Sequence, residues 1–122
     1  MEGLLIISLS YLIYMILALV GITLGYHKYF SHKEFAASPL AECLMLYCGM
    51  FCGLRSPLSW CGVHRMHHAY SDTDKDPHSA KNYPWYVILL SAWRLPTIER
   101  KFVRDLYKNS RVMFFHKHIY KI

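Results

Sequence analysis

The pattern of hydrophobic and polar positions begins with one long apolar run near the N-terminus. Residues 4–24 carry no charged side chain. About 20 apolar residues cross the hydrocarbon core of a bilayer, so this run predicts a transmembrane helix that continues toward His27. A cleaved signal peptide is the alternative, but such a peptide has a basic segment before a shorter apolar core. Here the only charged side chain before the run is Glu2, so we favour a retained span.

Two Ser-Pro pairs predict where the next helices begin. Ser38 and Pro39 have the residue types of an N-cap and a first helical turn, and they precede an apolar stretch over residues 40–54. That stretch is short for a simple span, so we expect a helix that is buried in protein, interfacial or re-entrant. Ser56 and Pro57 predict the start of another helix in the same way.

The second half of the chain alternates polar and amphipathic segments. Residues 71–84 are polar and rich in turn formers, whereas residues 85–93 are aromatic and apolar, which suits a membrane interface. Residues 97–122 repeat apolar positions at helical spacing among basic residues, which predicts an amphipathic cytoplasmic helix lying on the membrane. Strand signals are weak. The predicted fold class is therefore all-α: an integral membrane helical protein with one clear transmembrane helix plus cytoplasmic or interfacial helices.

Composition and charge support a membrane location. Hydrophobic residues make up 54% of the chain, which is high for a soluble domain. All 14 Lys and Arg residues lie at position 28 or later, so the positive-inside rule predicts that residues 25–122 are cytoplasmic. The net charge of +6 indicates proximity to anionic headgroups. The basic residues are scattered without a binding motif, so we expect no nucleic-acid partner.

The candidate chemistry lies in five histidines. His64, His67 and His68 occupy positions i, i+3 and i+4, which share one face of a helix. A lone histidine is usually explained by its own hydrogen bond, but three on one face, with His27 and His32 upstream, indicate a metal site. Imidazole suits zinc, copper, iron and nickel. Five histidines exceed one four-coordinate zinc site, so more than one metal, or one site of high coordination, is predicted, and iron and zinc both remain open.

The upstream pair is the weaker part of this prediction. A spacing of five puts His27 and His32 about 140° apart on a straight α-helix. They can converge only if the helix ends or loosens between them.

Alternating aspartates follow the triplet at Asp72, Asp74 and Asp76. A calcium loop would need Gly at its sixth position and Glu at its twelfth, where this chain has Pro77 and Tyr83, so calcium is rejected. Two interpretations stay open: acceptors that orient metal-bound imidazoles, or a capped, solvated turn.

The segments around both histidine groups resemble a known family. Residues 21–32 (GITLGYHKYFSH) are similar to the first histidine box of membrane fatty-acyl desaturases of the stearoyl-CoA (delta-9) type. Residues 64–68 (HRMHH), with the Asp-Pro-His at residues 76–78, are similar to the second box and its sequel. The resemblance covers residues 17–122 and includes the segments 104–106 and 112–116.

This resemblance implies a fold, a reaction and a set of partners. The family implies a cytoplasm-facing di-iron centre that uses O2 and two electrons to insert a double bond into a saturated acyl chain. The implied substrate is an acyl-CoA, and the implied electron donor is cytochrome b5 or a ferredoxin. By position, the implied metal ligands are His27, His32, His64, His67 and His68. Trp60 and Asp76 match positions near the substrate path or the box, whereas His78, His116 and His118 match no ligand.

The chain also departs from the family pattern. A third H-x-x-H-H box is absent from these residues, and so is the family's membrane helix that precedes the one leading into the first box. Five ligands do not saturate two iron ions, so we expect a partial desaturase domain over residues 1–122. A truncated gene, a partial gene model and one half of a split enzyme, whose missing ligands lie in a separate C-terminal half, all remain open. The alternatives are a non-catalytic histidine-rich membrane protein that binds zinc or copper, and a related histidine-box hydroxylase. The Gly-x-x-x-Gly-Tyr-His entry to the first box and the Asp-Pro-His sequel favour the desaturase.

Overall fold

The structure is a computed structural model that describes residues 1–89 and 96–119. The chain divides into two compact units, Met1–Gly53 and Leu54–Ile122. Every regular element in the described residues is an α-, π- or 3-10 helix, and those residues form no strand. The predicted all-α class is confirmed. The four cysteines are free thiols.

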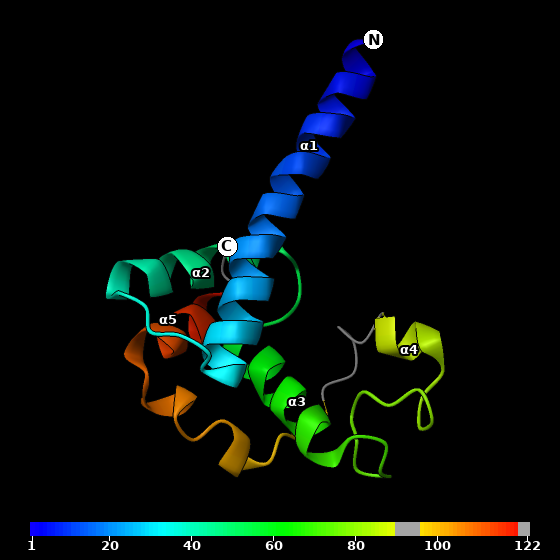
Figure 1. The fold of residues 1–122 in the computed structure, drawn as a ribbon, viewed down its shortest axis with the longest axis vertical. Coiled ribbons are helices and arrows are strands. Elements are labelled where there is room, and N and C mark those ends of the chain that lie inside the picture. The colour runs from blue at the N-terminus through cyan, green and yellow to red at the C-terminus, as the bar shows by residue number, and fades with distance from the viewer. Residues whose placement is uncertain (90–95, 120–122) are drawn as a thin grey trace. The chain divides into compact units, whose positions relative to one another are not determined.

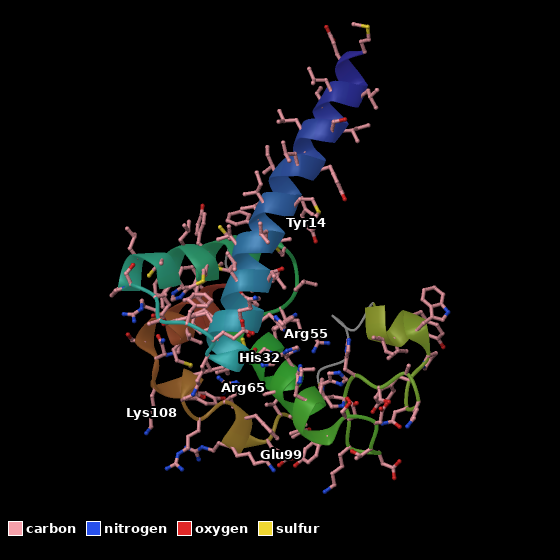
Figure 2. All side chains as sticks on the ribbon, in the orientation of Figure 1. Tyr14, His32, Arg55, Arg65, Glu99 and Lys108 are labelled. Atoms are coloured by element: carbon pink, nitrogen blue, oxygen red, sulfur yellow. The ribbon has the colours of Figure 1, made fainter. Side chains whose placement is uncertain are left out.

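The first unit is built on one long apolar helix. Helix α1 (Glu2–Ala18) runs directly into the π-helix η1 (Leu19–His32), drawn from blue to cyan in Figure 1. Figure 2 shows the side chains of α1, Tyr14 among them, projecting on every side, and none of the α1 residues is buried. The continuous helix from Glu2 to His32 is long and apolar enough to cross a membrane. The predicted apolar helix is therefore present, and it extends past residue 24.

Helix α2 (Pro39–Phe51) packs against η1 through glycines. A Cβ atom added at Gly21 would collide with the backbone N of Gly49. A Cβ at Gly49 would lie 2.6 Å from the ring of Tyr26. The two helices thus approach closely because neither carries a side chain at this point. Ser38 caps α2 as predicted, since its Oγ accepts a hydrogen bond from the backbone N of Ala41 at 3.2 Å.

The second unit begins with helix α3 (Pro57–Tyr70), which carries the histidine triplet. Ser56 caps it as predicted, because the Ser56 Oγ accepts from the backbone N of Ser59 at 3.2 Å. Residues 71–84 form turns and bends. Helix α4 (Trp85–Leu89) follows, and the remainder of the aromatic stretch lies outside the described residues.

The predicted amphipathic helix over residues 97–122 is wrong in its first half. Two short 3-10 helices, η3 (Arg100–Phe102) and η4 (Leu106–Lys108), precede helix α5 (Ser110–His118). The physical reason lies at Asn109, whose side chain accepts hydrogen bonds from the backbone N–H groups of residues 111 and 112. A side chain that caps a new helix competes with continuation of an earlier one. Residues 120–122 lie outside the described residues.

Candidate metal centre

The first histidine pair lies on the π-helical part of the long helix. The ring centroids of His27 and His32 are 4.6 Å apart, with the planes at 74°. A π-helix joins residues i and i+5 by its backbone hydrogen bonds, so residues five apart lie on consecutive turns of one face. The helix ends at His32, and the next residue, Lys33, has a left-handed φ of 57°. The loosened helix therefore gives the convergence that a straight α-helix would have prevented.

The triplet on α3 is more closely surrounded. The rings of His64 and His68 have centroids 4.5 Å apart, and those of His67 and His68 are 5.7 Å apart. The indole of Trp60 stacks on His64 at 4.9 Å with an interplanar angle of 17°. Trp60 thus contacts a histidine of the triplet directly and restrains the plane of that ring.

Asp76 connects the acidic turn to the triplet. Its side chain is fully buried, and the Asp76 Oδ1 lies 2.8 Å from the Nδ1 of His67. A carboxylate can only accept, so the imidazole tautomer with a proton on Nδ1 donates here. The Nε2 of His67 is then left with its lone pair, which is the arrangement that a carboxylate imposes on metal-binding histidines.

Asp76 is held in the ionised form by its surroundings. Burial alone would raise the pKa of this carboxyl, but hydrogen bonds from His67 and from the backbone N–H groups of His78 and Asp72 outweigh it. The pKa of Asp76 therefore lies below its ordinary value. By contrast Asp72 and Asp74 are exposed. Within the acidic turn, only Asp76 is both buried and bonded to the triplet.

The histidines that match no ligand have other contacts. The ring of His78 lies 5.6 Å from that of His67, centroid to centroid. The Nδ1 of His116 is 2.7 Å from the Oγ of the helix cap Ser56, and the Nδ1 of His118 is 2.7 Å from the carbonyl oxygen of Phe114. All three contacts lie within the second unit.

Two ion-paired groups beside α3 were not found from the sequence. Arg65 binds Asp105 through both ends of its guanidinium. The hydroxyl of Tyr70 donates to Glu99 at 2.7 Å, and Lys101 lies 2.8 Å from that same carboxylate. Partners 29 and 40 residues apart leave no periodic signal. The one available signal was that Arg65 is a charged residue in the middle of the histidine triplet.

Comparisons with known proteins place the chain in a family. The family model described as fatty acid desaturase matches residues 4–122. The chain is 32% identical over 115 residues to the sn-1 stearoyl-lipid 9-desaturase of Anabaena variabilis, covering 92% of this chain and 42% of that protein. It is 38% identical over 109 residues to a probable acyl-CoA desaturase of Schizosaccharomyces pombe, covering 84% and 22% respectively.

A plant relative extends this set. The chloroplastic palmitoyl-monogalactosyldiacylglycerol delta-7 desaturase of Arabidopsis thaliana is 38% identical over 80 residues, covering 66% of this chain and 22% of that protein. No solved structure matches the chain. The chain spans less than half the length of each of these three relatives. Because the family model matches nearly all of its residues, the chain belongs to the fatty acid desaturase family.

Proposed function

We propose that this chain supplies part of the metal centre of a membrane fatty-acyl desaturase. In this proposal the enzyme is an oxidoreductase that inserts a double bond into a saturated acyl chain with O2 and two electrons. The observation that carries the proposal is the buried Asp76 carboxylate hydrogen-bonded to Nδ1 of His67. That bond presents the opposite ring nitrogen as a ligand, which a histidine serving only packing does not need.

The proposed ligands fit iron by their chemistry. Neutral imidazole is an established ligand for iron as well as zinc and copper. Bound iron would supply the oxidising power that an unactivated C–H bond requires and that no side-chain acid or base provides. A di-iron centre needs more ligands than these five, and we propose that a third histidine box of the enzyme contributes them. The proposed iron ligands are His27, His32, His64, His67 and His68.

The neighbouring residues hold these ligands in place. Asp76 fixes the tautomer and the ring orientation of His67, and it stays ionised because its hydrogen bonds lower its pKa. Trp60 covers one face of the His64 ring and presents an apolar surface beside it. We propose that Trp60 also lies beside the acyl chain, where an apolar wall excludes water from the reacting carbons.

The substrate, the electron donor and the membrane orientation are proposed from the family resemblance, the relatives and the charge distribution. We propose delta-9 desaturation of an acyl-CoA, with an acyl-lipid as the alternative carrier because the relatives include both types. The electron donor would be cytochrome b5 or a ferredoxin. The long apolar helix would anchor the chain as an integral membrane protein, with the histidine region on the cytoplasmic side, as the distribution of Lys and Arg suggests.

Metal analysis of the purified chain tests the ligand set. The full chain is expressed in host membranes, purified in detergent and analysed for iron, zinc and copper by elemental mass spectrometry. We expect iron to co-purify with the parent and to fall by more than half in His27→Ala and in His67→Ala, as loss of a ligand would produce. His118→Ala is the matched control, because the Nδ1 of that histidine lies 2.7 Å from the carbonyl oxygen of Phe114 on its own helix.

Other outcomes would contradict the proposal. Equal metal content in the parent and both ligand variants removes these histidines from the ligand set. Stoichiometric zinc or copper, without iron, favours the non-catalytic metal-binding protein. Analysis of the acyl products in the complete enzyme separates the two reactions, because a desaturase yields a double bond and a hydroxylase yields an alcohol.

A further inference from the structure

Helix α3 has a histidine face and an opposite, packed face. At about 100° per residue, Trp60 and the three histidines of the triplet fall on one side of the helix. Gly62 and Met66 fall on the other side, and both are buried. Arg65 lies between the two faces, directly after His64 in the chain. The histidine face therefore points away from the side on which α3 is packed.

The packed face rests on the segment that follows residue 97. A Cβ atom added at Gly62 would lie 2.8 Å from side-chain carbons of both Ile98 and Val103. Val103 is 3% exposed and Met66 is 6% exposed. This contact is tight, but apolar packing is not directional. It holds α3 against the segment but does not fix the rotation of α3 about its own axis. A more directional contact is needed for that.

Arg65 provides that directional contact. Its Nη1 lies 2.7 Å from Oδ1 of Asp105, and its Nη2 lies 3.0 Å from Oδ2. The same Nη1 is 2.6 Å from the carbonyl oxygen of Phe102. Two parallel hydrogen bonds to one carboxylate fix both the distance and the angle between the guanidinium and the carboxylate. The Arg65 side chain, labelled in Figure 2, is only 14% exposed, whereas the Asp105 side chain is 39% exposed, so solvent reaches the carboxylate more than the guanidinium.

We propose that Arg65 and Asp105 are positioning residues for the metal centre. Their ion pair sets the rotation of α3, so that the imidazoles of His64, His67 and His68 keep the direction that metal binding requires. This inference rests on the proposed role of those histidines as ligands. Residues that orient ligands typically change metal affinity by about 10- to 100-fold when they are lost. A pair of this kind therefore acts on the metal without contacting it.

Cobalt(II) binding to the purified full chain tests the pair, since Co2+ accepts the same imidazole ligands and its visible bands report their geometry. We expect Asp105→Asn and Arg65→Lys each to weaken Co2+ binding about tenfold and to shift those bands. Lysine keeps the charge but cannot form the two-pronged bond. Glu99→Gln is the matched control, because it makes the same kind of change in the same segment, at a carboxylate that is 42% exposed and bonds Tyr70 and Lys101 instead of Arg65. It should bind Co2+ like the parent.

The readouts distinguish failure of this inference from failure of the proposed function. The inference is overturned if both pair variants bind Co2+ with parent affinity and spectrum while only their metal-free melting temperatures fall. Full binding by Arg65→Lys would likewise remove the requirement for the bidentate bond. His64→Ala serves as the reference for ligation itself. If it binds Co2+ as the parent does, the ligand assignment fails, and the positioning role fails with it.

Discussion

The two histidine-bearing helices are held in shape by different means. In η1 the pair His27 and His32 is brought together by the local backbone, because a π-helix places residues five apart on one face. In α3 the triplet is restrained by side chains outside the helix. Asp76 is nine residues from His67, and Asp105 is 40 residues from Arg65. The first site depends on helix form and close helix packing, and the second on polar contacts.

The largest expected effect is on the first unit and comes from its glycine contact. Gly21→Val places a branched side chain where even a Cβ would collide with the backbone of Gly49. A backbone cannot move aside as a flexible side chain can, so we expect a loss of stability of about 3 kcal/mol or more. Thermal unfolding of the purified chain in detergent measures it, together with the yield of folded protein.

The same helix supplies the control for this prediction. A Cβ at Gly3 meets nothing within 4 Å, so Gly3→Ala should leave the melting temperature unchanged or slightly higher, because alanine favours a helix. If Gly21→Val has the same melting temperature as the parent, then α2 does not pack on η1 through these glycines. The proposed contrast between η1, held by close helix packing, and α3, held by polar contacts, would then fail.

The next effect concerns the polar contacts of the second unit. Asp76→Asn removes the charge that accepts from His67 while keeping the size of the side chain. We expect metal affinity to fall by about 10- to 100-fold, measured by Co2+ titration. Asp74→Asn is the control, since Asp74 belongs to the same acidic turn and is exposed. Equal losses in both variants would mean that general charge, rather than the bond to His67, matters to the site.

The contrast between the helices also explains what the sequence could predict. The apolar run, the all-α class and the helix starts at Ser38 and Ser56 are local signals, and all were confirmed. The convergence of His27 and His32 needed a π-helix, which a 3.6-residue period does not anticipate. Contacts such as Arg65 with Asp105 join distant positions and leave no pattern along the chain.

The error over residues 97–109 has a different origin. Of the four apolar positions that recur at helical spacing, Val103 and Leu106 are buried, whereas Ile98 and Phe102 are partly exposed. The same spacing is compatible with two 3-10 turns that pack on a neighbouring helix. Asn109 then starts a separate helix by capping it. Periodicity therefore identified the apolar positions of this segment but not its backbone form.

The two units can also be compared by the same serine-to-alanine substitution at their helix caps, Ser38 and Ser56. Ser38 is exposed, and its Oγ accepts from the backbone N of Ala41, so Ser38→Ala should cost about 1 kcal/mol. Ser56 is 2% exposed and also bonds His116. Ser56→Ala removes the cap and takes away the partner of the half-buried His116 imidazole, so it should cost about 2 kcal/mol. Thermal unfolding of both variants gives the ranking, and equal losses would mean that the Ser56–His116 bond adds no stability.

The smallest expected effect is a pH dependence that arises from His116 in the second unit. Burial, followed by the charge of Lys117, lowers the pKa of His116 below its ordinary value. The unfolded chain then takes up a proton at a higher pH than the folded protein. The contribution to stability is therefore complete above the ordinary histidine pKa of about 6.5 and is lost as pH falls from there through the lower folded pKa.

His116→Gln isolates this contribution, because glutamine retains a polar group that can bond the Oγ of Ser56 but does not titrate in this range. The parent and the variant share every other histidine, so the difference between their melting temperatures at pH 7.5 and pH 5.5 reports His116 alone. We expect the parent to lose more stability on acidification than the variant. If both lose the same amount, the imidazole is as accessible to protons in the folded protein as in the unfolded chain, and the α3 cap is stabilised independently of pH. The contact between Ser56 and His116 would then stabilise α3 equally whether the imidazole is neutral or protonated.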